Sequence, residues 1–446
     1  MIDPIPHGFN RFHHPKGGRL PIKGWILALV IVLALIGCSE KRQRLTFWVG
    51  GAPQEIDYWE QLVAEFEQKA HVDVEVIRQP AATEQRKQGL VIALASRQPD
   101  PDLFLMDIIW ITQFVQSNWL EPLDPYFNEG SPARPGHFFP TVTETVDRHD
   151  HTYYALPAFL DVGVLVYRRD LLDRYGFDAP PTLWHELVRQ SLAVQAAERR
   201  NNPGFNGFVW QGAQYEGLVC TYLEFAASHG TGISSGKTVD LSASGNEQAL
   251  GFMHDLIHGY RISPPNTYTE MQEEEVRRSF QRGNALFERN WLYAWSLHQQ
   301  PDSVVRGKIG LAPLPHAPGA KSAAALGGWH LGISASSDVK PLAWRLAEFL
   351  LSHETQKKLM LKLGWYSARR DIYTDREVRR GIANVGTLEK IVATAVSRPD
   401  LAYYDQVSRV VQREVNACLA GKRGAAAAIE AMQREIASIE KQYGGH

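Results

Sequence analysis

After position 44, segments with the hydrophobic pattern of strands alternate along the chain with segments whose hydrophobic residues lie three and four positions apart. Leu45–Val49, Val72–Ile77 and Leu103–Met106 are short apolar or alternating runs, which is typical of strands. The segment after the first run carries apolar residues three and four positions apart, which predicts an amphipathic helix. A second helix is predicted to begin at Thr83, whose hydroxyl is expected to cap it.

The order strand, helix, strand, helix, strand predicts a parallel sheet with helices on both faces. Ligands on such sheets bind beyond the carboxyl ends of the strands. Three polar residues follow those ends in this chain, namely Glu55, Arg86 and Asp107. We therefore predict that these side chains lie at a ligand site.

A long extended segment begins at Tyr153 and ends in a buried apolar run. A strand of this length can leave one sheet and enter another, so we expect a crossing between two domains near Pro157–Asp161. Gly307–Pro315 is extended and contains prolines, and is expected as a second crossing. Ala402–Tyr443 has apolar residues at helical spacing, which predicts a helical tail.

The N-terminus carries an apolar run, Trp25–Ile36, preceded by basic residues. This run is shorter than the roughly 20 residues that a membrane-spanning helix needs, and it is typical of a signal peptide. The run ends in a sequence similar to a bacterial lipobox, so Cys38 would be acylated and would hold the mature chain to a membrane. We predict a signal peptide over residues 1–37 and a lipidated linker over residues 38–44. An uncleaved interfacial segment or short anchor is the alternative.

The composition narrows the possible ligands. The formal net charge of −2 excludes the strongly basic surface that nucleic acid demands. The chain has 12 Trp and 16 Tyr, whose flat faces suit stacking on sugar rings, although additional core is the alternative. Cys220 and Cys418 match no metal-site spacing; they could pair in an oxidising compartment, but we expect buried free thiols.

The motifs of several enzyme and cofactor classes are absent from the sequence. Residues 229–238 are similar to a phosphate loop, but Thr231 stands where glycine is required and no strand precedes the loop. Neither a His-Glu-x-x-His pattern nor a nucleophile elbow occurs, so we expect no metal and no cofactor. Glu55, Asp107 and Asp161 could be the acid and base of a glycosidase or acceptors for sugar hydroxyls. The residues alone leave both interpretations open.

Three aromatic residues, Trp291, Tyr293 and Trp329, differ from the rest in their setting. Each follows a strand and lies beside Gly, Asn or Arg rather than in a periodic apolar stripe. This setting favours contact with a ligand, with core packing as the alternative.

Segments from much of the chain resemble, in order and approximate spacing, the trehalose/maltose-binding proteins of ABC importers. The wider family is the extracellular sugar-binding proteins of the maltose-binding type, and the resemblance covers roughly residues 45–443. The segments are GGAPQEIDYW at 50–59, TEQR at 83–86, FLMD at 104–107, YALP at 154–157, GFVWQG at 207–212, YEGLVC at 215–220, SPPNTYTEM at 263–271, FERNW at 287–291 and LGGWH at 326–330.

The resemblance implies an α/β fold of the periplasmic-binding-protein type. Two α/β lobes would be joined by three hinge crossings, with a ligand cleft between lobes that close by hinge motion. We expect lobe 1 to comprise residues 45–157 plus 315–351, and lobe 2 to comprise residues 158–314 plus 352–446.

The resemblance also implies ligand contacts from both lobes. Carboxylates and arginines would bind sugar hydroxyls, and aromatic rings would pack on the sugar. The implied positions are Glu55, Arg86, Asp107, Asp161, Trp291, Tyr293, Gly328, Trp329 and Arg398. One position departs from the pattern: Phe159 stands where this family can carry Tyr, which leaves the choice among disaccharides open.

We therefore expect a monomeric receptor without enzymatic activity, anchored through Cys38 outside the cytoplasm. It would bind a disaccharide such as trehalose or maltose and deliver it to ABC permease subunits in the membrane. Its location would be the periplasm of a Gram-negative cell or the surface of a Gram-positive one. The alternatives are a receptor for another sugar or oligosaccharide such as sucrose, palatinose or maltodextrin, a sensory receptor, and a glycoside hydrolase.

Overall fold

The computed structural model describes residues 43–233, 238–382 and 385–443. The described residues from Arg44 onward form one compact unit. Among these described residues, no helix combines the length and the apolar character needed to cross a membrane. The expected signal peptide and the expected lipidation site, Cys38, lie outside the described residues and stay predictions.

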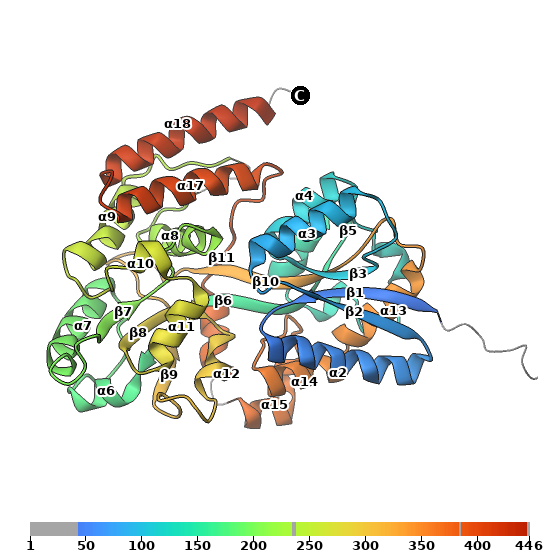
Figure 1. Ribbon diagram of the computed structural model, residues 1–446, viewed down its shortest axis with the longest axis horizontal. Coiled ribbons are helices and arrows are strands. Elements are labelled where there is room, and N and C mark those ends of the chain that lie inside the picture. Colours follow the sequence, from blue (N-terminus) through green and yellow to red (C-terminus); the bar gives the residue numbers. More distant parts are fainter. Residues whose placement is uncertain (1–42, 234–237, 383–384, 444–446) are drawn as a thin grey trace, which may run out of the picture. The chain divides into compact units, whose positions relative to one another are not determined.

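Three parallel strands form the sheet of one lobe, as the order of elements predicted. β1 (Arg44–Gly50) lies between β2 (Asp73–Gln79) and β3 (Leu103–Asp107) and pairs with both in parallel. The connections are α2 (Pro53–Ala70) and α3 (Thr83–Ala95). These two helices lie on opposite faces of the sheet (Figure 1). Because each helix follows a strand along the chain, its first turn lies at the carboxyl edge of the strands.

Two long strands, β6 and β10, connect the two lobes (Figure 1). β6 (Leu156–Arg168) pairs antiparallel with β10 (Ala324–Ile333) through its first half, up to Val162. From Gly163 onward it pairs antiparallel with β8 (Ala285–Trp291) in the other lobe. The long extended segment is therefore one continuous strand that leaves one sheet and enters the other.

The segment Gly307–Pro315 does not cross between the lobes, and that prediction was wrong. It contains β9 (Ile309–Ala312), which pairs antiparallel with residues 165–168 of β6 in the second lobe. The strand that crosses is β10, which pairs with β6 and, antiparallel, with β3 in the first lobe. A buried run of four residues has the same pattern in either lobe, so the sequence could not separate the two.

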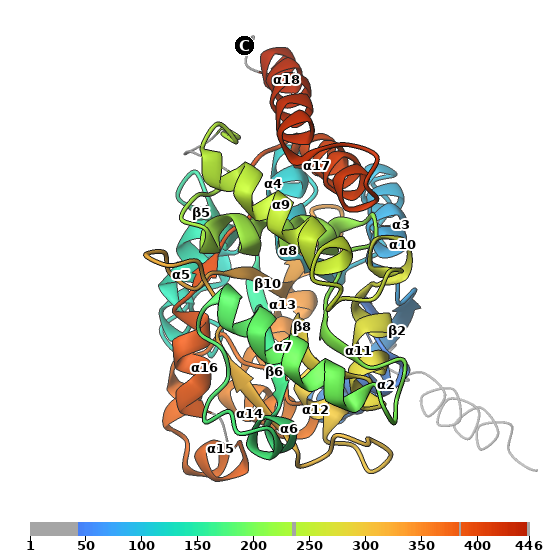
Figure 2. The same ribbon diagram turned by 90° about the vertical axis from the view of Figure 1, so that its left-hand side faces the viewer.

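The second lobe surrounds β8, which lies between β6 and the parallel strand β7 (Asn206–Val209). Helices α7 to α9 cover the side of this lobe that faces the viewer in Figure 2. The helices of this part of the chain are α6 (Arg169–Arg174), α7 (Trp184–Glu198), α8 (Glu216–Ser228), α9 (Ser244–His258), α10 (Thr267–Glu270), α11 (Glu273–Gln281) and α12 (Ala294–His298).

The C-terminal region is helical, as predicted. α17 (Tyr404–Leu419) and α18 (Ala425–Tyr443) pack on each other and on α8 and α9 of the second lobe (Figures 1 and 2). Before them, β11 (Ala395–Val396) pairs with the start of β10. Residues 397–403 therefore connect the crossing strands to the terminal helices.

Residues after β10 return to the first lobe before the chain enters α16. The Phe139 N–H donates to the Ala368 carbonyl over 3.0 Å, and the Leu160 N–H donates to the Tyr366 carbonyl over 2.7 Å. The lobe boundaries stay a prediction, and these contacts favour placing this segment with lobe 1. Its elements are α13 (Lys340–Leu351), α14 (His353–Leu363), η5 (Asp371–Thr374) and α15 (Arg376–Gly381), and α16 (Val385–Val392) follows.

Short elements connect β3 to β6 in the first lobe, and a small hairpin of β4 and β5 lies among them. They are η1 (Ile108–Trp110), α4 (Ile111–Gln116), η2 (Asp124–Tyr126), η3 (Pro135–His137), α5 (Pro140–Val142), η4 (Thr143–Asp147), β4 (Arg148–His149) and β5 (Thr152–Tyr153).

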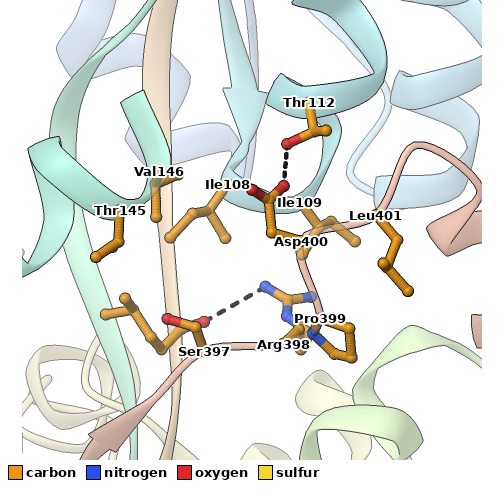
Figure 3. A pocket seen from close by; sticks show the side chains of 11 residues that line it. Ile108, Ile109, Thr112, Thr145, Val146, Ser397, Arg398, Pro399, Asp400 and Leu401 are labelled. Carbon is orange, nitrogen blue, oxygen red and sulfur yellow. Dashed lines mark hydrogen bonds between the residues drawn. The ribbon is translucent and has the colours of Figure 1, made fainter. Parts of the chain in front are cut away.

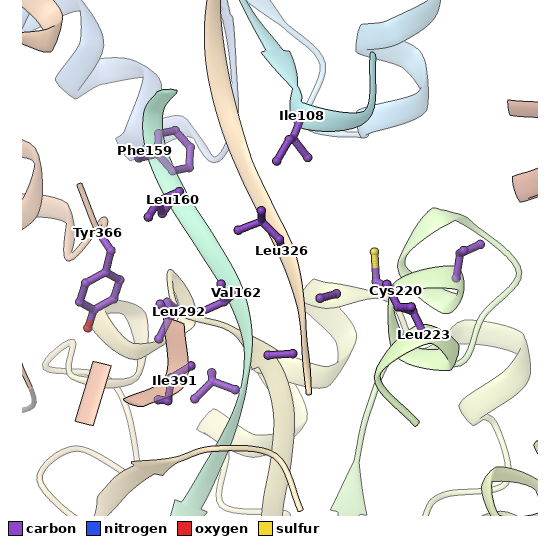
Figure 4. Packing of buried hydrophobic residues seen from close by; sticks show 14 of the residues in the cluster. Ile108, Phe159, Leu160, Val162, Cys220, Leu223, Leu292, Leu326, Tyr366 and Ile391 are labelled. Atoms are coloured by element: carbon purple, nitrogen blue, oxygen red, sulfur yellow. The ribbon is translucent and has the colours of Figure 1, made fainter. Parts of the chain in front are cut away.

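Buried apolar side chains continue through the crossing strands from one lobe to the other. Leu160, Val162 and Leu326 are almost inaccessible to solvent and lie along β6 and β10 (Figure 4). Cys220 and Cys418, the two cysteines in the described part of the chain, are buried free thiols, which confirms that prediction. The two crossing strands are therefore part of the hydrophobic core, and this core continues from one lobe into the other.

Gly163 marks the point where β6 changes partners, and it tests this packing. A Cβ added there would lie 1.8 Å from the Glu224 Oε1 atom, which is buried. We expect Gly163→Ala to lower the free energy of urea unfolding by about 1–3 kcal/mol because of overpacking. The matched control is Gly251→Ala in α9, where an added Cβ would meet nothing within 4 Å. It should be neutral or stabilising by up to about 1 kcal/mol; equal effects of the two changes would contradict this packing argument.

Candidate functional site

Glu55 lies in the first turn of α2, directly after β1. Its Oε2 atom accepts the Ala52 N–H over 2.7 Å, and its Oε1 atom accepts the Trp365 indole N–H over 3.2 Å. Burial raises the pKa of Glu55, and the negative charge of Glu274 in the other lobe raises it further. The Glu55 carboxylate therefore lies close enough to the second lobe for the charge of Glu274 to act on it.

Arg86 lies in the first turn of α3, and its guanidinium carbon lies 3.9 Å from the centroid of the Trp329 ring. Its Nη2 atom donates to the Ala81 carbonyl over 3.3 Å and to the Thr83 hydroxyl over 3.2 Å. The predicted cap was wrong, because Ala82 is the N-cap residue and the Thr83 hydroxyl binds Arg86 instead. Burial lowers the pKa of Arg86 to about 10, so the side chain remains a cation at neutral pH.

Arg398 joins the two lobes at the segment after β11. Its Nη2 atom donates to Asp107 Oδ1 of the first lobe over 3.3 Å. Its Nη1 atom donates to Glu216 Oε1 of the second lobe over 3.0 Å. The residue is 8% exposed, so this bridge forms in the interior, where charge-assisted hydrogen bonds are strong.

The same segment contacts the first lobe at two further points. Asp400 accepts a hydrogen bond from the Thr112 hydroxyl (Figure 3), and Asp405 forms an ion pair with Lys87 of α3. A small pocket lies beside this segment, and both apolar and polar side chains line it, among them Ile108, Thr112, Arg398 and Asp400 (Figure 3). The segment 397–405 therefore spans from the second lobe onto the first.

Trp291 and Tyr293 form the opposite wall, at the end of β8. The Trp291 indole N–H donates to Glu273 Oε1 over 3.3 Å, and the Tyr293 hydroxyl donates to Glu274 Oε1 over 3.0 Å. No sequence pattern indicated a role for these two glutamates. They begin α11, where acidic side chains are favoured by the helix dipole, so their position already had a local explanation.

Asp161 lies on β6, close to the point where the strand changes partners. Its Oδ1 atom accepts the Leu292 N–H over 2.7 Å and the Val162 N–H over 3.1 Å. Burial raises the pKa of Asp161 to about 8, against the effect of these bonds and of the Arg289 charge. The side chain thus fixes the turn after β8 and carries a proton more readily than an ordinary aspartate.

Gly328 brings the backbone of β10 close to that of β6. Its φ angle is +139°, and an added Cβ would lie 2.7 Å from the Phe159 carbonyl oxygen. The pairing of these strands is irregular between Trp329 and His330. Only glycine combines this conformation with this approach, so Gly328 allows β10 to lie close to β6 directly before Trp329.

Trp365 is a further residue that no sequence pattern indicated. Its ring stacks on Phe159 with centroids 4.1 Å apart and an interplanar angle of 21°. Besides binding Glu55 through its indole N–H, it packs against Trp59 of α2. Trp365 lies 310 positions from Glu55 in sequence, and no local pattern connects the two.

The predicted residues therefore come together from both lobes at the place where the lobes meet. The charge of Glu273 in the second lobe acts on Arg86 in the first, as that of Glu274 acts on Glu55. Carboxylates accept hydrogen bonds, arginines donate them, and indole rings offer apolar faces. This combination suits a polyhydroxylated ligand. Within the described ranges, no group of three or more His, Cys, Asp or Glu side chains is placed to hold a metal ion.

Comparison with known proteins gives the family. The model of the bacterial extracellular solute-binding proteins matches residues 52–357. The chain belongs to this family. A probable ABC transporter-binding protein of Deinococcus radiodurans is 31% identical over 426 residues, which cover 94% of this chain and 99% of that protein.

Two solved structures extend this result. The maltose-bound MalE3 of T. maritima is 35% identical, with a TM-score of 0.82, and the match covers 89% of this chain and 99% of that one. A solute-binding protein of Thermotoga lettingae bound to α-D-tagatose is 27% identical, with a TM-score of 0.79 and the same coverage. These likenesses confirm the predicted fold of two α/β lobes.

Family membership identifies the general role of the protein. It is an extracytoplasmic solute-binding protein of an ABC sugar importer, and its partners are a sugar and the membrane permease. The relatives are binding proteins and not enzymes, which favours the receptor over the glycoside hydrolase. The carboxylates are then best interpreted as hydrogen-bond acceptors.

The raised pKa of Asp161 predicts a pH-dependent contribution to stability. Between its ordinary value of 3.8 and its folded-state value of about 8, the folded protein holds more protons on this group than the unfolded chain does. The group therefore reduces stability as the pH rises through this window. Asp161→Asn keeps the oxygen that accepts the Leu292 N–H but cannot ionise.

We expect the Asp161→Asn variant to gain stability relative to the wild type as the pH rises from about 5 to about 8. Urea unfolding of the ligand-free proteins across this range measures the difference. If the difference between the two proteins stays constant with pH, the raised pKa of Asp161 is wrong.

Proposed function

We propose that the protein binds a disaccharide of the trehalose or maltose type and delivers it to the permease. The observation that supports this proposal is that carboxylates, arginines and two tryptophans from both lobes lie close together where the lobes meet. A disaccharide presents many hydroxyls and apolar ring faces, which these groups can satisfy together. The maltose bound by MalE3, a protein 35% identical to this chain, supports the choice.

Each predicted residue has a role in this proposal. The charged side chains of the first lobe, the crossing strand and the C-terminal segment bind hydroxyls, and the aromatic side chains pack on the sugar rings. Gly328 contributes through its backbone. The full set is Glu55, Arg86, Asp107, Asp161, Trp291, Tyr293, Gly328, Trp329 and Arg398.

Another sugar is the second candidate, and two observations favour keeping it. The Thermotoga lettingae protein is bound to α-D-tagatose although it shares the fold and 27% of the sequence. Phe159 has no hydroxyl where the resemblance allows Tyr, and its ring packs on Trp365. A missing hydrogen-bond partner can change discrimination between sugars strongly, so sucrose, palatinose and maltodextrin belong in the test.

We also propose that the mature protein is a monomer anchored to a membrane through acylated Cys38. The short apolar run before this residue and the lipobox-like ending support the anchor. The anchor would keep the receptor close to the permease that it serves.

A panel of sugars tests the proposed ligand. We expect trehalose or maltose to raise the thermal stability of the chain from Ser39 onward, and glucose to do so little. A ligand that binds only the folded state adds about 2.7 kcal/mol at 100 times its dissociation constant. Thermal shift and calorimetry with trehalose, maltose, sucrose, palatinose, maltotriose, tagatose and glucose measure this. If a sugar other than trehalose or maltose gives the tightest binding, the disaccharide assignment falls and the receptor role remains.

Replacement of Trp329 tests the cleft. Trp329→Ala removes an apolar face and also the ring that covers the Arg86 guanidinium, so we expect sugar binding to weaken by about 1 kcal/mol or more. Isothermal titration calorimetry with the sugar that the wild type binds measures the change.

The matched control is Trp119→Ala. The Trp119 ring packs on Phe114, with 5.5 Å between the ring centroids, and the Trp119 carbonyl accepts the Ala335 N–H beyond the end of β10. Because these contacts lie away from the proposed sugar contacts, the affinity should stay unchanged. Unchanged affinity in Trp329→Ala, or an equal loss in the control, would remove Trp329 from the site.

A further inference from the structure

A buried ion pair lies behind Trp291, on the side of the second lobe. Arg289 of β8 donates from Nε to Glu224 Oε2 over 2.7 Å and from Nη2 to Glu224 Oε1 over 2.5 Å. Both side chains are 1% exposed. Nη1 of Arg289 also donates to Gln211 Oε1 over 3.2 Å, so the guanidinium is held in one orientation.

The guanidinium lies over the ring of Trp291, with 4.3 Å between its central carbon and the ring centroid. The indole N–H of Trp291 donates to Glu273. The ring also lies close to Gly327, where an added Cβ would lie 2.9 Å from Trp291 Cζ3. Trp291 is therefore fixed by contacts from β8, α11 and β10. A planar cation over an indole face is a favourable arrangement that strengthens when the pair is removed from water.

The carboxylate of the pair is tied to the crossing strands. Glu224 Oε1 accepts the Ala325 N–H of β10 over 2.9 Å. The space beside it on β6 is closed, because an added Cβ at Gly163 would lie 1.8 Å from the same oxygen. Gly163 is also the residue that pairs with Trp291 in the register of β6 and β8. The pair thus connects Trp291 to both strands that cross between the lobes.

Stability alone does not explain such a pair. Two charges removed from water cost desolvation free energy, and apolar residues of similar volume are often as stable or more so. An arginine adds a flat, rigid donor group that binds a carboxylate with two parallel bonds and stacks on an aromatic ring. Lysine carries the same charge, but it has neither the planar group nor the pair of parallel N–H donors.

We propose that Arg289, with Glu224 as its counter-ion, is a positioning residue for ligand recognition: it holds the Trp291 ring from behind and sets the orientation in which the ring meets the sugar. Arg289 is 0% exposed, so it acts through Trp291 rather than on the ligand. Arg86 covers Trp329 in the same way in the other lobe. The inference rests on the proposed function, because it takes the ligand of Trp291 to be a sugar.

Affinity and stability measured together test the proposal. Arg289→Lys keeps the charge and removes the planar fork, and we expect it to raise the dissociation constant of the sugar about tenfold. Glu224→Gln, which keeps the volume of the side chain, should act in the same direction. Calorimetry gives the affinity, and urea unfolding without ligand gives the stability of each variant.

The matched control is His298→Gln. His298 Nε2 lies 2.6 Å from Glu288 Oε2, and both residues are 0% exposed. Glu288 precedes Arg289 in β8, so its side chain points to the opposite face of the strand. Within the described residues, Glu288 is connected to Trp291 only through the Asn290 side chain, which binds the backbone N–H of Trp291 and not its ring. This control should therefore lose stability and keep the dissociation constant within about twofold. An equal loss of affinity in the control, or wild-type affinity in both Arg289→Lys and Glu224→Gln, overturns the proposal.

A second measurement needs no ligand. A double-mutant cycle of Arg289→Lys and Trp291→Phe, followed by urea unfolding of the free proteins, reports the coupling between the two side chains. We expect the effects to be non-additive, and additive effects overturn the proposal. If Arg289→Lys does not fold, Glu224→Gln takes its place in the cycle. A wild type that binds no sugar of the panel would contradict the proposed function, and the cycle would still decide whether Arg289 positions Trp291.

Discussion

The pairing of β6 with β10 is the contact on which the rest of the structure depends. These antiparallel strands continue from the sheet of one lobe toward that of the other. Asp161 and Trp329 lie on them, and Trp291 stands in register with Gly163. Because hydrogen-bonded strands keep their register, a displacement of one lobe must bend this pair and change the distance between the cleft walls. The geometry of the cleft is therefore set by the crossing.

The second constraint is electrostatic, since several ionisable groups are buried where the two lobes meet. Burial raises the pKa of Glu55 and Asp161, because the charged form of a carboxylate loses its hydration. Each carboxylate therefore has a donor from the protein: backbone N–H groups for Asp161, an indole for Glu55 and Arg398 for Asp107. In the proposed function, a sugar would add hydroxyl partners to these groups without adding charge, so binding would introduce no new desolvated ion.

Local patterns predicted one wall of the cleft better than the other. Glu55, Arg86 and Asp107 were placed correctly at the carboxyl edge because β-α-β order determines which strand ends meet. Glu273 was missed because a glutamate in the first turn of a helix is explained by the helix alone. Trp365 was missed because its partner lies at the other end of the chain. Both omissions concern residues whose role depends on a neighbour from another element.

The sequence by itself determined the alternation of strands and helices, the helical tail and the long extended segment from Tyr153, because backbone periods of 2 and 3.6 act over a few residues. Only the tertiary structure decided that β9 stays in the second lobe, that Arg398 bridges the two lobes and that Arg289 lies behind Trp291. These contacts join segments distant in sequence or depend on how a strand packs. These contacts form because folding brings charged groups and aromatic rings from distant segments together in the interior. The local spacing of hydrophobic residues does not predict which segments will meet.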